Sequence, residues 1–77
     1  MKEKIYELLE KVNKRIVQYE GKDMLEDEIV ESMEVMDIVG AVEEELGIEI
    51  GPEFIIPDYF MTKDTIVKLV EDVLKEA

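Results

Sequence analysis

The sequence predicts an all-α fold, a small up-and-down helical bundle that forms a single domain over residues 1–77. In three stretches, apolar residues recur at the i, i+3, i+4, i+7 spacing of amphipathic helices. Glycine and proline fall between these stretches, where they are typical of helix ends and turns. The only alternating stretch, Ile48-Glu49-Ile50, is too short to make a sheet alone, and we interpret it as an extended linker.

The first helix is expected over residues 3–19. Five of the chain's nine cations lie in it or directly before it, namely Lys2, Lys4, Lys11, Lys14 and Arg15. Its core stripe consists of Ile5, Leu8, Leu9, Val12, Ile16 and Tyr19. Gly21 is a plausible C′ residue that closes this helix. Residues 20–31 then form a long loop, and a loop of this length in a small domain is often functional. Four apolar loop residues are expected to plug into the bundle, namely Met24, Leu25, Ile29 and Val30.

The central helix is expected over residues 32–46, with Gly47 as its C′ glycine. At 100° per residue, one face carries a core stripe: Val35, Ile38, Val39, Ala41, Val42 and Leu46. The opposite face carries Ser32 at the first turn, then Met33, Met36 and several carboxylates. Ser32 has two interpretations here, because serine is a preferred N-cap residue and its hydroxyl can also be a functional group.

The C-terminal third is expected to hold a short helix and a long one. Gly51-Pro52 is a turn signal, and Pro57 makes residues 53–61 suit a short, irregular helical segment. This apolar segment could line a pocket, although core packing is the commoner outcome. Thr62 or Asp64 can cap the last helix. Its predicted core residues are Ile66, Leu69, Val70, Val73 and Leu74.

Composition narrows the classes of function. The net charge of −12 disfavours nucleic-acid and anionic-membrane partners and favours a partner with a basic patch. The chain has no cysteine and no histidine, so it lacks the usual general base and the commonest metal ligands, and no metal site is predicted. The loop carboxylates Asp23, Glu26, Asp27 and Glu28 do not follow the calcium-loop pattern. Without a signal-peptide pattern or a membrane-spanning run, a cytoplasmic protein is expected. The chain is also expected to be a monomer.

Three consecutive residues open the central helix with an acidic residue, a serine and a methionine, Glu31-Ser32-Met33. An acidic loop precedes them, a run from Val35 to Ile50 follows, and a threonine leads into the final helix. Over about its full length, this pattern resembles the acyl carrier protein family. The resemblance implies a four-helix bundle with a long loop between helices 1 and 2 and a short third helix.

The resemblance also implies a function. Ser32 would accept 4′-phosphopantetheine from coenzyme A, transferred by a separate phosphopantetheinyl transferase with Mg²⁺. The arm would carry acyl groups as thioesters between enzymes, as in fatty acid biosynthesis, and the chain itself would be no enzyme. Its partners would be loading ligases and acyl-transferring enzymes with basic docking patches. The docking residues would be Glu31, Met33, Glu34, Met36, Asp37, Gly40, Glu43 and Glu44.

Several departures leave the cargo open. Glu31 stands where the family usually has aspartate, Ile29-Val30 occupies a lead-in that often holds glycine, and Gly40 replaces a larger apolar residue. The stretch from Phe54 to Ile66 looks closer to D-alanyl or other aminoacyl carriers. The first alternative is therefore a D-alanyl, aminoacyl or peptidyl carrier. The second is a small acidic helical adaptor that binds a basic partner and carries no prosthetic group.

Overall fold

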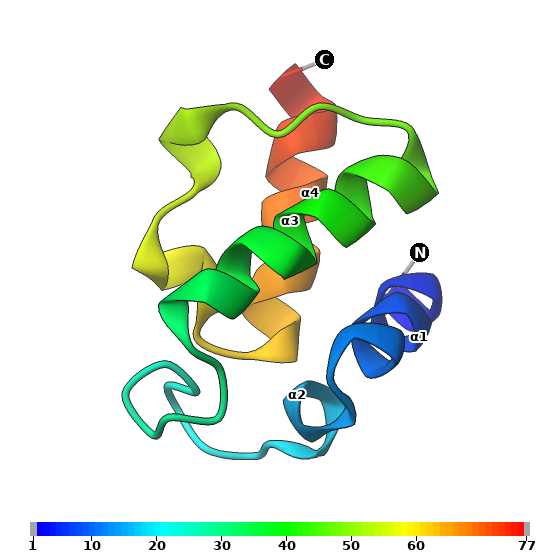
Figure 1. Cartoon of the computed structure of the whole chain (residues 1–77). Coiled ribbons are helices and arrows are strands. Elements are labelled where there is room, and N and C mark those ends of the chain that lie inside the picture. Colours follow the sequence, from blue (N-terminus) through cyan, green and yellow to red (C-terminus); the bar gives the residue numbers. More distant parts are fainter. Residues whose placement is uncertain (1, 77) are drawn as a thin grey trace.

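The computed structural model describes residues 2–76, and over this range the chain is helical without a strand. Figure 1 shows α3 crossing α4, with α1 and α2 beside them. The elements are α1 (Lys2–Val12), α2 (Lys14–Gln18), α3 (Ser32–Leu46), the 3-10 helices η1 (Pro52–Phe54) and η2 (Pro57–Phe60), and α4 (Lys63–Glu76). The prediction of a small all-α fold is confirmed.

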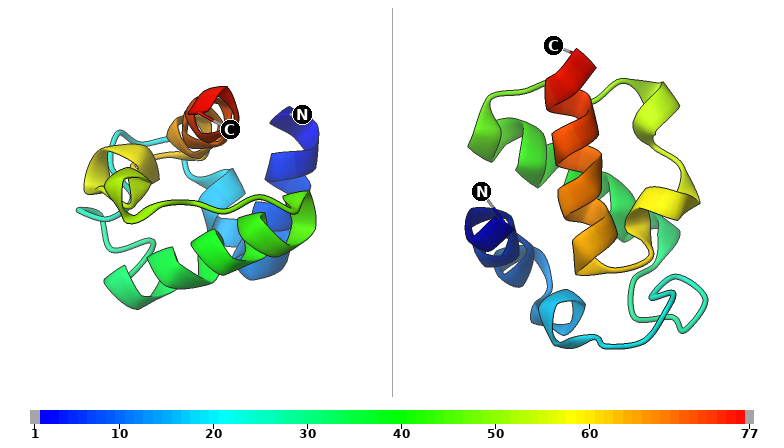
Figure 2. Two further views of the ribbon diagram at one scale, coloured as in Figure 1. Left: turned by 90° about the horizontal axis from the view of Figure 1, so that it is seen from above. Right: turned by 180° about the vertical axis from the view of Figure 1, so that it is seen from behind.

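The core is built from apolar side chains of α1, α3 and α4, and it also takes in residues from the connecting segments. Ile5 of α1, Ile38 of α3 and Leu69 of α4 have no exposed surface. Helix α1 packs against both α3 and α4, and the two views in Figure 2 show these three helices around one centre. The apolar stripes read from the sequence therefore face one another.

The first predicted helix is wrong in one respect, because it is broken at Asn13. Helix α1 ends at Val12, and Asn13 has extended backbone angles (φ −164°, ψ 107°). Its side-chain oxygen accepts a hydrogen bond from the backbone N–H of Arg15 over 3.0 Å and so caps α2. Asparagine side chains compete in this way with the helical backbone. Ile16 still reaches the core after the break, so the apolar spacing does not reveal it.

The prediction that Gly21 closes this helix is also wrong. Helix α2 ends at Gln18 with Tyr19 as an extended C-cap, and Gly21 does not have the left-handed conformation. Gly21 instead lies against the Tyr19 ring, where a Cβ would collide with the hydroxyl. That hydroxyl accepts a hydrogen bond from the Asp23 N–H (2.8 Å) and donates one to Asp27 (2.6 Å). Tyr19 thereby fixes the start of the long loop.

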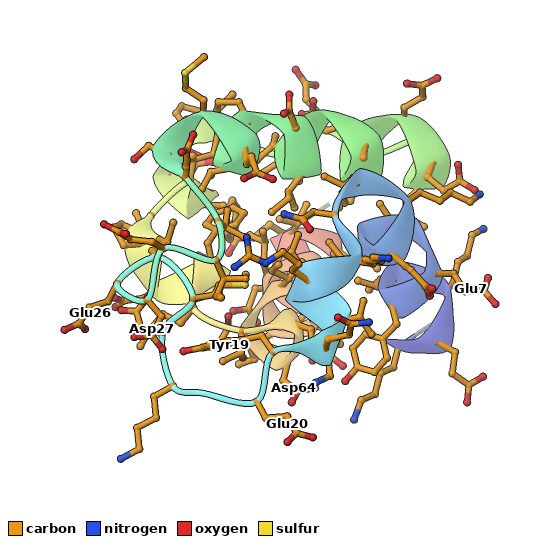
Figure 3. All side chains as sticks on the ribbon, turned by 60° about the horizontal axis from the view of Figure 1, so that its bottom comes forward. Glu7, Tyr19, Glu20, Glu26, Asp27 and Asp64 are labelled. Carbon is orange, nitrogen blue, oxygen red and sulfur yellow. The ribbon has the colours of Figure 1, made fainter. Side chains whose placement is uncertain are left out.

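The loop over residues 20–31 contains no helix, as predicted, and it is anchored in the core. Met24 is fully buried and Val30 is 1% exposed. The Met24 N–H donates to the Met61 carbonyl over 2.8 Å, which ties the loop to the segment before α4. Figure 3 shows Glu20 and Glu26 on the outside of this loop, and both are exposed. The apolar plug was thus predicted correctly, and it sets the path by which the chain enters α3.

Helix α3 has the bounds that the sequence predicts, and Gly47 ends it in the left-handed conformation (φ 64°, ψ 36°). The Gly47 N–H donates to the Glu43 carbonyl, which is the expected C-terminal cap.

Gly47→Ala is expected to lower the free energy of unfolding by about 1 kcal/mol, because a Cβ is strained at this positive φ. Gly40→Ala is the matched control. It adds the same methyl group within α3, where nothing lies within 4 Å, and should raise stability by about 0.5–1 kcal/mol. Urea unfolding followed by circular dichroism measures both. Equal effects of one sign at the two positions would contradict the different roles assigned to these glycines.

The predicted short third helix is instead a pair of 3-10 helices. Each begins with a proline, Pro52 in η1 and Pro57 in η2. Proline fits the first turn of a helix but cannot continue one, since it has no N–H and its ring clashes with the preceding turn. Between α3 and η1, the predicted linker has no strand structure, and Ile50 is buried at 5% exposure.

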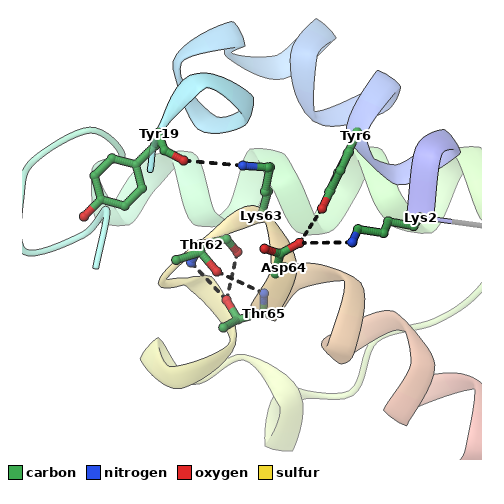
Figure 4. A network of polar contacts seen from close by, with 7 residues as sticks. All are labelled: Lys2, Tyr6, Tyr19, Thr62, Lys63, Asp64 and Thr65. Carbon is green, nitrogen blue, oxygen red and sulfur yellow. Dashed lines mark hydrogen bonds and ion pairs between the residues drawn. The ribbon is translucent and has the colours of Figure 1, made fainter. Parts of the chain in front are cut away.

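Helix α4 begins after a threonine cap, as one of the two predicted options requires. The Thr65 N–H donates to Thr62 Oγ1 (3.2 Å) and the Thr62 N–H donates to Thr65 Oγ1 (3.0 Å). Figure 4 shows this reciprocal pair. Asp64 is not the cap, because it points toward α1, where it accepts a hydrogen bond from the Tyr6 hydroxyl and lies 3.8 Å from Lys2 Nζ.

The core face of α4 differs from the prediction at one position. Leu74 was expected in the core but is 39% exposed, whereas Val67 is buried at 9%. Leu74 lies near the end of α4, beside an open hollow lined by the 47–54 segment, which does not cover it. Helical spacing places Leu74 on the correct face, but no element within residues 2–76 packs over that part of the face.

A polar contact holds η2 against α4. The Tyr59 hydroxyl donates to Asp72 Oδ2, and Lys68 Nζ lies 2.9 Å from the other oxygen. The hydrogen bond from Tyr59 and then the one from Lys68 hold the pKa of Asp72 below its ordinary value. This contact positions the segment that faces the start of α3.

Candidate functional site

Ser32 is the first residue of α3 rather than its N-cap. The N-cap is Glu31 (φ −91°, ψ 161°), which forms a capping box with Glu34. The Glu31 N–H lies 3.5 Å from Glu34 Oε1 within this box. Ser32 is exposed, and within residues 2–76 its hydroxyl makes no hydrogen bond. The N-cap interpretation of Ser32 is therefore wrong, and its hydroxyl is accessible for another role.

An apolar cavity of about 190 Å³ lies directly beside Ser32. It opens to solvent and is bordered by the long loop, the first turns of α3 and the 55–60 segment. Its lining residues are Leu25, Ser32, Val35, Met36, Ile55, Ile56, Pro57 and Phe60. Ser32 is the only member of this lining with a polar side chain. The sequence indicated a possible pocket at residues 53–61 but gave no reason to join Leu25 and Val35 to it.

Other hollows are similarly open but have more polar linings. One of about 480 Å³ adjoins Ser32 on the loop side and is lined by Leu25, Glu28, Val30, Glu31 and Ser32. A larger hollow, of about 580 Å³, lies between the 47–54 segment and the end of α4. It is at the opposite end of α3 from Ser32 and contains no hydroxyl side chain, so size alone does not identify the site.

Most of the predicted docking residues share the outer face of α3 with Ser32. Met33 is 81% exposed and Met36 is 55% exposed, which is unusual for large apolar side chains. The remaining exposed members are Glu31, Asp37, Gly40 and Glu44. This face is negative, because it carries the exposed carboxylates of Glu31, Asp37 and Glu44, and α3 contains no lysine or arginine.

Two of the predicted docking residues are instead partly buried and take part in internal hydrogen bonds. Glu43 Oε2 accepts a hydrogen bond from the Ile50 N–H over 2.9 Å and holds the linker after α3. Glu34 Oε2 accepts one from Asn13 Nδ2 over 3.0 Å. Their carboxylates are thus less available to a partner than those of Asp37 and Glu44.

Glu43→Ala is expected to lower the free energy of unfolding by about 1 kcal/mol, because the Ile50 N–H loses its acceptor. Glu43→Gln retains an oxygen acceptor and should recover most of this loss. Glu44→Ala, on the exposed face, should change stability by less than about 0.5 kcal/mol. Chemical unfolding of the three variants measures these changes in the free energy of unfolding. Equal losses for Glu43→Ala and Glu44→Ala would contradict a stabilising hydrogen bond from the Ile50 N–H to Glu43.

Two further properties bear on the site. Among residues 2–76, no group of three or more acidic, histidine or cysteine side chains is arranged to hold a metal ion. In the same range, no helix combines the length and apolar character needed to cross a lipid bilayer.

Comparison of the chain with protein-family models, with curated proteins and with solved structures gave no match. The functional assignment therefore rests on the geometry around Ser32 and on the sequence pattern that surrounds it.

Proposed function

We propose that this chain is a freestanding acyl carrier protein that carries acyl groups on a 4′-phosphopantetheine arm attached to Ser32. One observation carries the proposal. Ser32 presents an exposed hydroxyl at the first position of α3, with no hydrogen bond to any group of residues 2–76, because the N-cap position belongs to Glu31. The motif Glu31-Ser32-Met33 and the order of the segments around it add support. We expect such a carrier to act as a monomer in the cytoplasm.

The residues around Ser32 fit this group. A transferase would join the Ser32 oxygen to the arm's phosphate, with release of the nucleotide part of coenzyme A. The positive end of a helix favours a phosphate at its first turn. Glu31 lies close by, but it is exposed, so water and ions screen its repulsion. When bound, the arm supplies the thiol that holds an acyl group as a thioester, and the chain contains no thiol of its own.

The cavity beside Ser32 favours an apolar cargo. Apart from Ser32 itself, its lining offers only aliphatic, proline, methionine and phenylalanine side chains. An apolar chain gains free energy on leaving water for such a lining, whereas a charged amino group would find no partner in it. We therefore place acyl groups before D-alanyl, aminoacyl or peptidyl cargo. Loading of the modified protein with fatty-acid and amino-acid ligases in parallel distinguishes these cargoes.

The outer face of α3 suits brief docking to enzymes with basic patches. Met33 and Met36 provide adaptable apolar contact, and Asp37 and Glu44 provide exposed negative charge. Charge steering speeds association and weakens with salt, which suits a protein that must leave each partner. The same surface would serve the alternative function, an acidic adaptor without a prosthetic group.

The test is attachment of the arm. The protein is incubated with coenzyme A, Mg²⁺ and a broad-specificity phosphopantetheinyl transferase, and its intact mass is recorded. We expect a single mass increase of one phosphopantetheine and the appearance of one titratable thiol per chain. The unmodified chain has no cysteine, so the thiol assay starts from zero. If neither the mass increase nor the thiol appears, the carrier proposal is overturned, and the acidic adaptor without a prosthetic group is the remaining proposal.

A further inference from the structure

A hydrogen bond joins the break in the first predicted helix to the start of α3. Asn13 Nδ2 donates to Glu34 Oε2 over 3.0 Å, at a partly buried position. Among residues 2–76, it is the only hydrogen bond between side chains that reaches α3. Because the acceptor is a carboxylate, this is a charge-assisted bond, which is stronger than one between neutral groups.

Both polar atoms of the Asn13 side chain and both oxygens of the Glu34 carboxylate take part in hydrogen bonds. Asn13 Oδ1 accepts the Arg15 N–H over 3.0 Å, so the amide nitrogen has to face Glu34. Glu34 Oε1 in turn faces the Glu31 N–H at 3.5 Å. A continuous chain of bonds therefore runs from the start of α2, through Asn13 and Glu34, to the residue that precedes Ser32.

We infer that Asn13 is a positioning residue for Ser32. This inference rests on the proposed function, in which the Ser32 hydroxyl is modified. Among residues 2–76, the Ser32 side chain makes no hydrogen bond, so the direction of its hydroxyl depends on the backbone of the first turn of α3. Glu34 fixes that turn, and Asn13 fixes Glu34. A reacting group held in a productive orientation reacts faster than one that samples several.

The amide donor on Asn13 and the carboxylate acceptor on Glu34 can be exchanged by substituting both residues. In Asn13→Asp, the new carboxylate can still cap Arg15 but opposes the carboxylate of Glu34. In Glu34→Gln, the single amide oxygen can accept from Asn13 or from the Glu31 N–H, but not from both. The Gln amide nitrogen then faces the other donor, and that hydrogen bond is lost. The double variant restores the pattern, since the Gln amide donates to the Asp carboxylate and its oxygen accepts from the Glu31 N–H. The net charge of the pair is also restored.

The experiment measures kcat and KM of the transferase for the wild type, both single variants and the double variant. We expect each single variant to lower kcat/KM by about tenfold, mainly through kcat, and the double variant to return to within about twofold of wild type. Glu44→Gln is the matched control, because it removes one charge from the exposed face of α3. It should alter KM alone, as loss of a docking contact would.

Amide hydrogen exchange over residues 31–35, followed by NMR on the unmodified protein, provides a readout independent of the transferase. Exchange there should be faster in each single variant and restored in the double variant. If the transferase does not modify the wild type at all, the proposed function fails. Amide hydrogen exchange still tests whether Asn13 stabilises the first turn of α3 through Glu34. Single variants with wild-type kcat, or a double variant without rescue of kcat, would overturn the positioning role of Asn13.

Discussion

Ser32→Ala is expected to abolish attachment of phosphopantetheine while it leaves the free energy of unfolding within about 0.5 kcal/mol of the wild type. The loss is complete because alanine has no oxygen to join to phosphate. Stability is retained because the Ser32 side chain is exposed and makes no hydrogen bond within residues 2–76. This combination separates an attachment residue from a cap, since loss of a serine N-cap usually costs about 1 kcal/mol.

Intact mass after incubation with the transferase and urea unfolding of the unmodified protein measure the two halves of this prediction. Glu34→Ala is the informative companion, because the Glu34 carboxylate accepts hydrogen bonds from Asn13 and from the Glu31 N–H, and this variant should lose stability but keep the attachment site. A mass increase that survives Ser32→Ala would mean that another residue is modified. A loss of about 1 kcal/mol in Ser32→Ala would mean that the serine caps α3 after all.

Phe60→Ala is expected to have the largest effect on stability, a loss of about 3–5 kcal/mol. Phe60 is 1% exposed and is one of the largest fully buried side chains. It lies in η2, which packs against α4, and it also lines the cavity beside Ser32. Because a domain of this size has a total stability of roughly 3–5 kcal/mol, the variant should be largely unfolded at 25 °C.

Circular dichroism at 25 °C and urea unfolding test this expectation. Phe60→Leu retains most of the buried volume and should remain folded with a smaller loss. Ile56→Ala removes apolar surface from the same cavity at a residue that is 40% exposed, so it should stay close to wild type. A Phe60→Ala variant as stable as Ile56→Ala would show that the 55–60 segment contributes little to the core.

The candidate site was only partly predictable from the sequence. Ser32, Met33 and Met36 were placed correctly on the outer face of α3, because a helical period assigns each residue to a face whatever its neighbours do. The apolar cavity beside Ser32 could not be derived in this way. Its lining includes Leu25 from the loop and Ile55 from a later segment, and no local sequence pattern indicates that these two segments lie side by side.

The sequence by itself determined the class of fold, the bounds of α3, the Gly47 cap and the burial of apolar residues from the long loop. Each follows from local chemistry or from the spacing of apolar residues.

Only the tertiary structure decided which polar groups meet. It brought Glu34 to Asn13 and Glu43 to the Ile50 N–H. It also decided for Thr62 over Asp64 as the cap of α4 and left Leu74 uncovered. The spacing of apolar residues indicates which face of a helix packs on the core, but it does not name the residues that this face contacts. The partner of a hydrogen bond comes from a distant part of the chain, and only the packed fold brings it within reach.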